Sequence, residues 1–223
     1  YNDLYELDIM IADGHEMTSL GQKVKQINIA KKMKDKITSA DLFEEALYES
    51  CDGVSYKYAA YNPVQASGTL VVWLHGLGEG GTINTDPYIT VLANKVSSLA
   101  GQEFQNTIGG ANILVPQCPT FWMDKTGDSL ATKFTEADGT SYYCDSLHEL
   151  INFYRKETKS EKVIITGCSN GGYMTMLMAL KYGKEYNAYV PICEAFLNEK
   201  ISDEEIKQLK KLPIFFIYSR DDD

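Results

Sequence analysis

The chain has 223 residues, of which 44% are hydrophobic and 23% are charged, a composition typical of a globular protein with one large domain, alone or with a small extra piece. Its formal net charge of −10 at pH 7 opposes nucleic-acid binding, because phosphates would be repelled. No stretch has the roughly 18 uninterrupted apolar residues that a membrane-spanning helix needs. The five cysteines lack Cys-x-x-Cys spacing, so we expect no metal site.

The first fifty residues differ in pattern from the rest of the chain. Apolar and polar residues alternate around Asp13-Gly14, a dipeptide that favours a tight hairpin turn. A basic stretch follows, which we interpret as a solvated edge. Residues 38–50 fit either a short helix or a strand, and the helix is the preferred interpretation. Residues 54–63 are predicted to form a strand that ends at Pro63.

From residue 69 onward, apolar runs alternate with helical patterns. The runs predict strands buried on both faces of a parallel sheet, at residues 69–76, 112–117, 162–167, 188–193 and 213–220. Helical patterns occur between them, at residues 88–101, 141–157 and 202–212 and directly after Ser169. This alternation predicts an α/β fold with a mostly parallel sheet and helices on both faces.

The sequence Gly-Cys-Ser-Asn-Gly-Gly at residues 167–172 joins a predicted strand to a predicted helix. Ligands of open parallel sheets bind at the carboxyl ends of the strands, where Ser169 lies. Gly167 and Gly171 permit a very tight turn that would raise the serine hydroxyl above the sheet. This pattern is typical of a Gly-x-Ser-x-Gly nucleophile elbow. The alternative is a glycine-rich turn whose serine only caps the helix.

A second loop follows an earlier buried strand and reads His75-Gly76-Leu77-Gly78. Acyl transfer needs two N–H donors aimed at the developing oxyanion. We expect one donor from the backbone of Asn170, the residue after the serine, and the other from Leu77. His75 is interpreted as a structural histidine that ties the loop to its neighbours.

Acidic side chains complete the set of candidates. Asp221, Asp222 and Asp223 follow the last predicted strand, and each could orient an imidazole, unless they form only a solvated acidic turn. Glu79 and Glu194 are candidates for substrate contact. For Glu79, pairing with loop amides is an equal alternative.

The motifs LHGLGEGG, VPQCPTFWMD, GCSNGGYMTM, VPICEAF and PIFFIYSRDDD together resemble the α/β-hydrolase superfamily over roughly residues 52–223. The resemblance is to bacterial esterases related to prolyl oligopeptidase, feruloyl esterases and polyhydroxybutyrate depolymerases. It implies that Asp222 is the catalytic acid and that the loop carrying Trp122 borders the substrate pocket. It also implies a hydrolase domain at residues 51–223, preceded at residues 1–50 by a β-rich extension or the remnant of a small domain.

In this superfamily the catalytic residues follow the order Ser, Asp, His. Only one residue follows Asp222, and the three histidines fit the role of base poorly. His15 lies in the predicted hairpin, His75 in the loop, and His148 on a helix facing away from the strand ends. We therefore expect the base, with a last strand and helix, beyond Asp223. The alternatives are a base other than histidine and a non-catalytic relative.

The expected function is hydrolysis of short-chain or aryl carboxylic esters through an acyl-enzyme formed on Ser169. The alternatives are a serine peptidase of the prolyl-oligopeptidase type and a non-catalytic hydrolase-fold protein. The expected partner is a small-molecule ester, without metal or cofactor, and the oligomeric state stays open. The fifteen tyrosines favour a secreted or cell-envelope protein over a cytoplasmic one, but the compartment also stays open.

Overall fold

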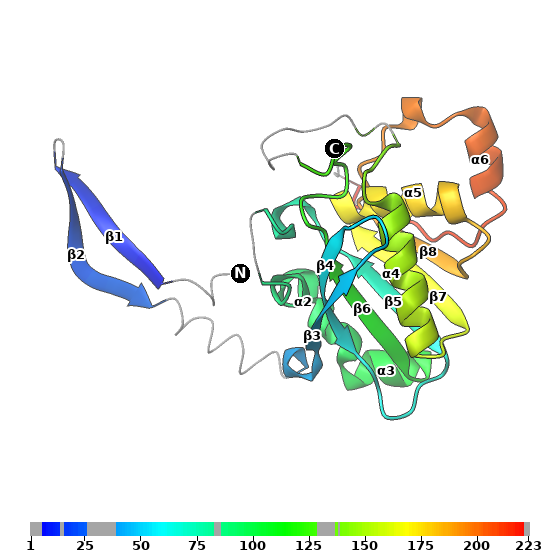
Figure 1. Cartoon of the computed structure of the whole chain (residues 1–223), viewed down its shortest axis with the longest axis horizontal. Helices are drawn as coiled ribbons and strands as arrows, with labels where there is room; N and C mark the ends of the chain where they lie inside the picture. Colours follow the sequence, from blue (N-terminus) through cyan, green and yellow to red (C-terminus); the bar gives the residue numbers. More distant parts are fainter. Residues whose placement is uncertain are drawn as a thin grey trace.

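The computed structural model describes residues 6–13, 16–25, 39–82, 86–128, 137 and 139–220 (Figure 1). Strands β1 (Glu6–Asp13) and β2 (Glu16–Lys25) pair antiparallel in a two-stranded sheet of their own. This antiparallel pairing confirms the predicted hairpin, and Gly14 of the predicted turn lies outside the described residues. The basic stretch at residues 26–36 and His15 lie outside the described residues.

A six-stranded sheet with the order β3-β4-β6-β5-β7-β8 organises the rest of the described chain. Its β3, β4 and β6 pair antiparallel, whereas β6, β5, β7 and β8 run parallel, which confirms the predicted mostly parallel sheet. The strands are β3 (Glu44–Glu49), β4 (Ser55–Tyr61), β5 (Thr69–Leu74), β6 (Ala111–Gln117), β7 (Lys162–Cys168) and β8 (Ala188–Ile192).

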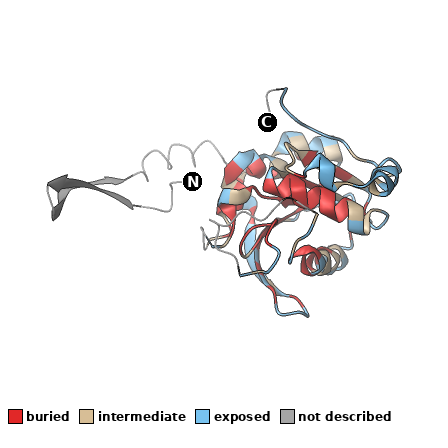
Figure 2. Ribbon diagram, turned by 90° about the horizontal axis from the view of Figure 1, so that it is seen from above, coloured by how far each residue is buried: buried red, intermediate tan, exposed pale blue. Residues whose placement is uncertain are grey.

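Helices cover both faces of this sheet and enclose two apolar cores (Figures 1 and 2). Successive side chains of a strand point to opposite faces. On β5, Leu70 and Val72 therefore enter the core that α4 and α5 cover, and Val71 and Trp73 enter the core below α2, η3 and α3. The helices are α2 (Ile89–Leu92), α3 (Gln102–Ile108), α4 (Cys144–Glu157), α5 (Asn170–Tyr182) and α6 (Asp203–Leu209), and the 3₁₀ helices are η1 (Ala40–Leu42), η2 (Leu77–Glu79), η3 (Ala93–Ala100) and η4 (Asn198–Lys200).

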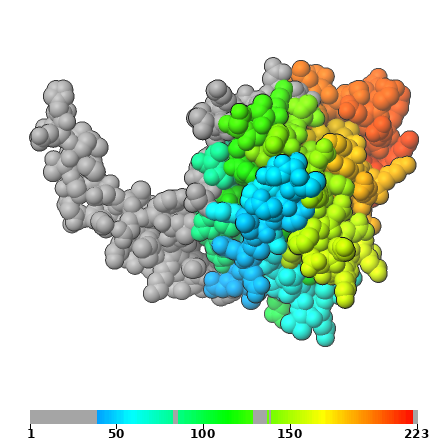
Figure 3. Space-filling view, viewed as in Figure 1, coloured from blue at the N-terminus to red at the C-terminus, as the bar shows by residue number. Residues whose placement is uncertain are grey.

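The preference for a helix at residues 38–50 is wrong, because only η1 is helical there and β3 follows it. β3 gains its backbone partners from β4, in a register that runs from Glu44 opposite Ala60 to Glu49 opposite Ser55. This long-range pairing overrides the local preference. β3 also lies beside α4, where the Tyr48 hydroxyl donates to Glu149 Oε1 at 2.6 Å, and both elements contribute to the face seen in Figure 3. β3 therefore belongs to the six-stranded sheet, although it falls within the predicted N-terminal extension.

The helix predicted at residues 88–101 is interrupted. Asn94 and Lys95 have positive φ angles of 51° and 57°, so the chain is not helical there. This break separates α2 from the helical residues of η3 that follow it. A second helix, α3, follows at Gln102–Ile108, where the sequence pattern predicted none.

The strand predicted at residues 213–220 appears as two isolated parallel bridges to β8, Tyr189 with Ile214 and Ile192 with Ile217. Ile217 N–H donates to Pro191 O at 3.0 Å, so the segment lies along the β8 edge. Its large apolar side chains are exposed, from Phe215 to Tyr218. Among the described helices, none combines the length and the apolar character needed to cross a membrane.

Candidate active site

Ser169 forms the turn between β7 and α5, with φ 55° and ψ −114°. A positive φ is uncommon for a residue with a side chain and marks local strain. Two backbone hydrogen bonds hold the turn: Ser169 N–H donates to Ile192 O, and Tyr173 N–H donates to Ser169 O, each at 2.9 Å. The serine side chain makes no capping bond to the helix, and the residue is exposed. The capping role that was the alternative interpretation is therefore wrong.

Glycines flank the serine because the helix begins very close to the neighbouring backbone. A Cβ at Gly167 would lie 2.5 Å from Gly171 O. A Cβ at Gly171 would lie 2.7 Å from His75 O and would overlap the carbonyl of Leu74 as well. No side chain fits at either position without separating β5, β7 and α5. The pattern of small residues thus has a steric cause.

The loop that carries Leu77 reaches the same edge of the sheet as Ser169. β5 and β7 are parallel neighbours, and Leu74 lies opposite Gly167 in their register. Leu77 then opens η2 and is half-buried, whereas Gly78 is exposed. The Leu77 loop and the turn at Ser169 therefore leave two neighbouring strands at the same edge of the sheet.

His75 is completely buried, and both of its ring nitrogens are engaged. Its Nδ1 donates to Gly76 O at 2.7 Å, and its Nε2 accepts from Cys118 N–H at 2.9 Å. Burial lowers the pKa of His75 to about 4, against the opposing effect of the bond to Gly76. The ring is therefore neutral near pH 7 and unavailable to Ser169, which confirms the prediction of a structural histidine.

Trp122 bonds both the His75 loop and the start of α5, and it has no exposed surface. Its indole N–H donates to His75 O at 3.1 Å, and its backbone N–H donates to Asn170 Oδ1 at 2.7 Å. Asn170 is itself buried, with 2% of its surface exposed. The bond between residues 122 and 170 was not predicted, and no local signal in the sequence indicates it.

The two candidate glutamates differ in accessibility. Glu79 is 3% exposed, and its Oε1 accepts from Asn94 Nδ2 at 2.9 Å. Glu194 is half-buried, and its Oε2 accepts from Phe196 N–H at 2.6 Å. Burial raises the pKa of Glu194, and the bond from Phe196 opposes that shift. A Cβ at Gly172 would lie 2.8 Å from Glu194 Cα, so Glu194 adjoins the first turn of α5.

The remaining predicted groups are not brought to the serine within the described residues. Asp222 and its two neighbours lie outside them, as does His15. His148 stacks on Tyr182 with ring centroids 3.7 Å apart, and its Nδ1 bonds the Tyr186 hydroxyl at 2.6 Å. Because α5 has 13 residues and rises 1.5 Å per residue, this contact is about 20 Å from Ser169. As predicted, His148 faces away from the strand ends.

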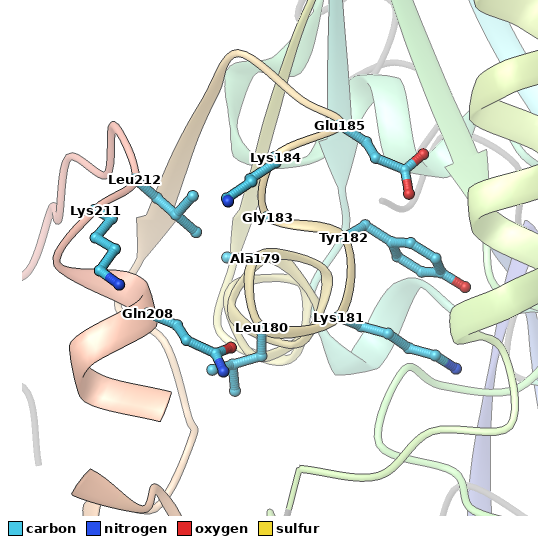
Figure 4. Close-up of a pocket in the computed structure, with 10 residues that line it drawn as sticks. All are labelled: Ala179, Leu180, Lys181, Tyr182, Gly183, Lys184, Glu185, Gln208, Lys211 and Leu212. Atoms are coloured by element: carbon cyan, nitrogen blue, oxygen red, sulfur yellow. The ribbon is translucent and has the colours of Figure 1, made fainter. Parts of the chain in front are cut away.

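A cavity of about 420 Å³ lies between the end of α5 and α6 (Figure 4). Its lining includes Lys184, Gln208 and Lys211. It adjoins the end of α5 opposite to Ser169 and so does not belong to the candidate site. In the part of the chain that the structure describes, no group of three or more His, Cys, Asp or Glu side chains could hold a metal ion. None of the five cysteines, all of which lie in the described residues, forms a disulfide bond.

The fold has many relatives among solved structures. A thermostable esterase is 22% identical with a TM-score of 0.64, and the match covers 82% of this chain and 56% of that one. Poly(aspartic acid) hydrolase-1 from Sphingomonas sp. KT-1 is 16% identical with a TM-score of 0.55, and the match covers 80% and 72% of the two chains. The S-formylglutathione hydrolase of Staphylococcus aureus is 18% identical with a TM-score of 0.51, with coverage of 80% and 76%.

At these identities the structural matches show the fold alone, and the chain spans little more than half the length of the thermostable esterase. No curated protein matches the sequence. Residues 58–223 match the family described as phospholipase/carboxylesterase. This match covers most of the chain and includes both loops that meet at the sheet edge. The chain therefore belongs to the phospholipase/carboxylesterase family, within the α/β-hydrolase superfamily.

Proposed function

We propose that the protein hydrolyses carboxylic esters of short-chain or aryl type, with Ser169 as the nucleophile. The observation that carries the proposal is the exposed serine on a positive-φ turn, which makes no capping bond to the helix that follows. A serine that served only the fold would gain nothing from this strained backbone. The family match supports a hydrolase of the esterase type.

In the proposed reaction, Ser169 Oγ attacks the ester carbonyl carbon while a general base takes its proton. The carbonyl π electrons move to oxygen, and the backbone N–H groups of Leu77 and Asn170 bind the resulting oxyanion. Each such donor lowers the barrier by roughly 3 to 4 kcal/mol. The intermediate then expels the alcohol, which takes the proton from the base, and water hydrolyses the acyl-enzyme by the same steps.

Neither described histidine can be that base, because His75 is fully buried with both ring nitrogens bonded and His148 lies about 20 Å away. The proposal therefore places the base outside the described residues, with Asp222 as the acid that orients it. Among the three candidate contact residues, Glu194 is the best placed for substrate, because Trp122 and Glu79 have almost no exposed surface.

The test is hydrolysis of p-nitrophenyl acetate by the full-length protein. Ser169→Ala should lower kcat/KM by about 10³-fold or more, because loss of the nucleophile leaves only residual catalysis. Ser98 provides the matched control, since it is also exposed and its φ is not positive. Ser98→Ala should leave the rate unchanged. Equal rates in the two variants would refute the role of Ser169, and a preference for aminoacyl nitroanilides over esters would point to a peptidase.

A further inference from the structure

The loop that follows β6 is bonded to the loop that follows β5. Gly81 N–H donates to Cys118 O at 2.8 Å, and Cys118 N–H donates to His75 Nε2 at 2.9 Å. The Gln117 side chain adds a bond from Nε2 to Glu79 O at 3.0 Å. The two loops therefore form one bonded unit at the sheet edge.

Trp122 extends this unit to the start of α5. Its indole N–H is bonded to His75 O, and its backbone N–H is bonded to the side chain of Asn170. His75 O also faces the helix directly, because a Cβ at Gly171 would lie 2.7 Å from it. One residue thus bonds the loop that carries Leu77 and the residue that follows Ser169.

The loop around Trp122 is itself held by a buried carboxylate. Asp124 has no exposed surface, and its Oδ2 accepts from Thr120 Oγ1 at 2.6 Å. Its Oδ1 accepts from the backbone of Thr126 and Gly127, at 2.9 and 3.1 Å. Asp124 thus fixes the loop both before and after Trp122. A tryptophan in a loop fixed in this way can keep a constant distance to its own hydrogen-bond partners.

We propose that Trp122 is a positioning residue that holds the backbone N–H groups of Leu77 and Asn170 at the spacing an oxyanion requires. This proposal rests on the proposed function, because ester hydrolysis at Ser169 is what would produce an oxyanion for both N–H groups to bind. A donor pair contributes most when its geometry is fixed before the reaction, and small displacements of such groups cost rate rather than substrate affinity.

The test compares the same chemical change at the two tryptophans of the chain. Trp122→Phe keeps an aromatic ring and removes the N–H that binds His75. Trp73→Phe is the matched control, because Trp73 is 8% exposed and its indole nitrogen has no hydrogen-bond partner among the described residues. With p-nitrophenyl acetate, Trp122→Phe should lower kcat about tenfold with KM unchanged, and Trp73→Phe should alter neither.

A double-mutant cycle separates this role from ordinary packing. Asn170→Ala removes the acceptor of the Trp122 backbone N–H but keeps its own backbone N–H. Either substitution breaks the link that runs from His75 through Trp122 to Asn170. The double variant should therefore lose about as much kcat as one single variant. A loss equal to the product of the two single losses would overturn the proposal, as would an unchanged kcat in Trp122→Phe.

Amide hydrogen exchange gives a second measurement that does not depend on activity. The amides of Gly81 and Cys118 bond the two loops, so Trp122→Phe should speed their exchange at least tenfold relative to the central strands. Equal acceleration across the sheet, or none, would overturn the proposal. A wild-type protein without Ser169-dependent hydrolysis would refute the proposed function instead, and exchange alone would then decide whether Trp122 holds the loops.

Discussion

Ser169→Gly should make the protein more stable while abolishing ester hydrolysis. The φ and ψ of Ser169, 55° and −114°, fall outside the allowed left-handed helical region, where ψ is positive. Such a conformation costs on the order of 1 to 3 kcal/mol for a residue with a Cβ, and glycine adopts positive φ without that cost. The serine side chain makes no capping bond whose loss would offset the gain.

The expected gain is the strain relieved minus the greater entropy that glycine loses on folding, which is about 0.5 to 1 kcal/mol. The net increase in the free energy of unfolding is therefore about 1 kcal/mol. With a urea slope of about 3 kcal/mol/M, the unfolding midpoint should rise by about 0.3 M. Equilibrium unfolding in urea, followed by circular dichroism, measures this shift.

Two variants control for other effects of the substitution. Ser169→Ala removes the hydroxyl but keeps the Cβ, so it should leave the midpoint nearly unchanged. Ser98→Gly makes the same change at an exposed serine without positive φ and should lower the midpoint. The strain argument is refuted if Ser169→Gly lowers the midpoint as Ser98→Gly does, or if Ser169→Ala raises it equally.

Three further predictions concern the residues around the serine. Gly171→Ala should destabilise the protein by about 2 kcal/mol or more in urea unfolding, whereas Gly78→Ala, where a Cβ has open space, should not. His75→Leu should cost about 2 kcal/mol or more, since it leaves the buried N–H of Cys118 without a partner and removes one of the two bonds to Gly76 O. Wild-type stability should also fall as the pH drops from the unfolded pKa of His75, about 6.5, towards its folded pKa of about 4. The raised pKa of Glu194 has the opposite effect on stability: because the folded state favours the protonated carboxyl, this group stabilises the protein as the pH falls. Relative to wild type, Glu194→Gln should therefore be more stable at pH 7 than at pH 4, and an unchanged difference between these two pH values would contradict the effect of burial.

The central strands could be predicted because each of their two faces packs against an apolar core, so apolar residues are needed on both faces. Every residue of β5 and of β6 is buried, so both strands appear in the sequence as continuous apolar runs. The elbow could be predicted for a steric reason, since the contact of α5 with β5 excludes any side chain at Gly171. In both cases a contact within the fold restricts which residue types a short stretch can contain.

Features that depend on distant partners could not be predicted in this way. β3 is a strand because β4 pairs with it, and its own residues are mostly exposed. The break at Asn94 and Lys95 is a change of backbone angle that apolar periodicity does not encode. The bond between Trp122 and Asn170 joins a loop to the first residue of α5, 48 residues further on, and nothing in either segment marks the other as its partner.

The strand order explains why a tryptophan suits the connection at the sheet edge. β6 and β7 are not neighbours, because β5 lies between them. Strands in a sheet are about 4.8 Å apart, so the loop after β6 must reach across about 10 Å to meet the start of α5. Trp122 bonds Asn170 through its backbone and reaches His75, at the end of the intervening strand, with the N–H of its long side chain. Phenylalanine or leucine would also be apolar at this position but could not donate to that carbonyl, so the hydrogen bond gives Trp122 its proposed role.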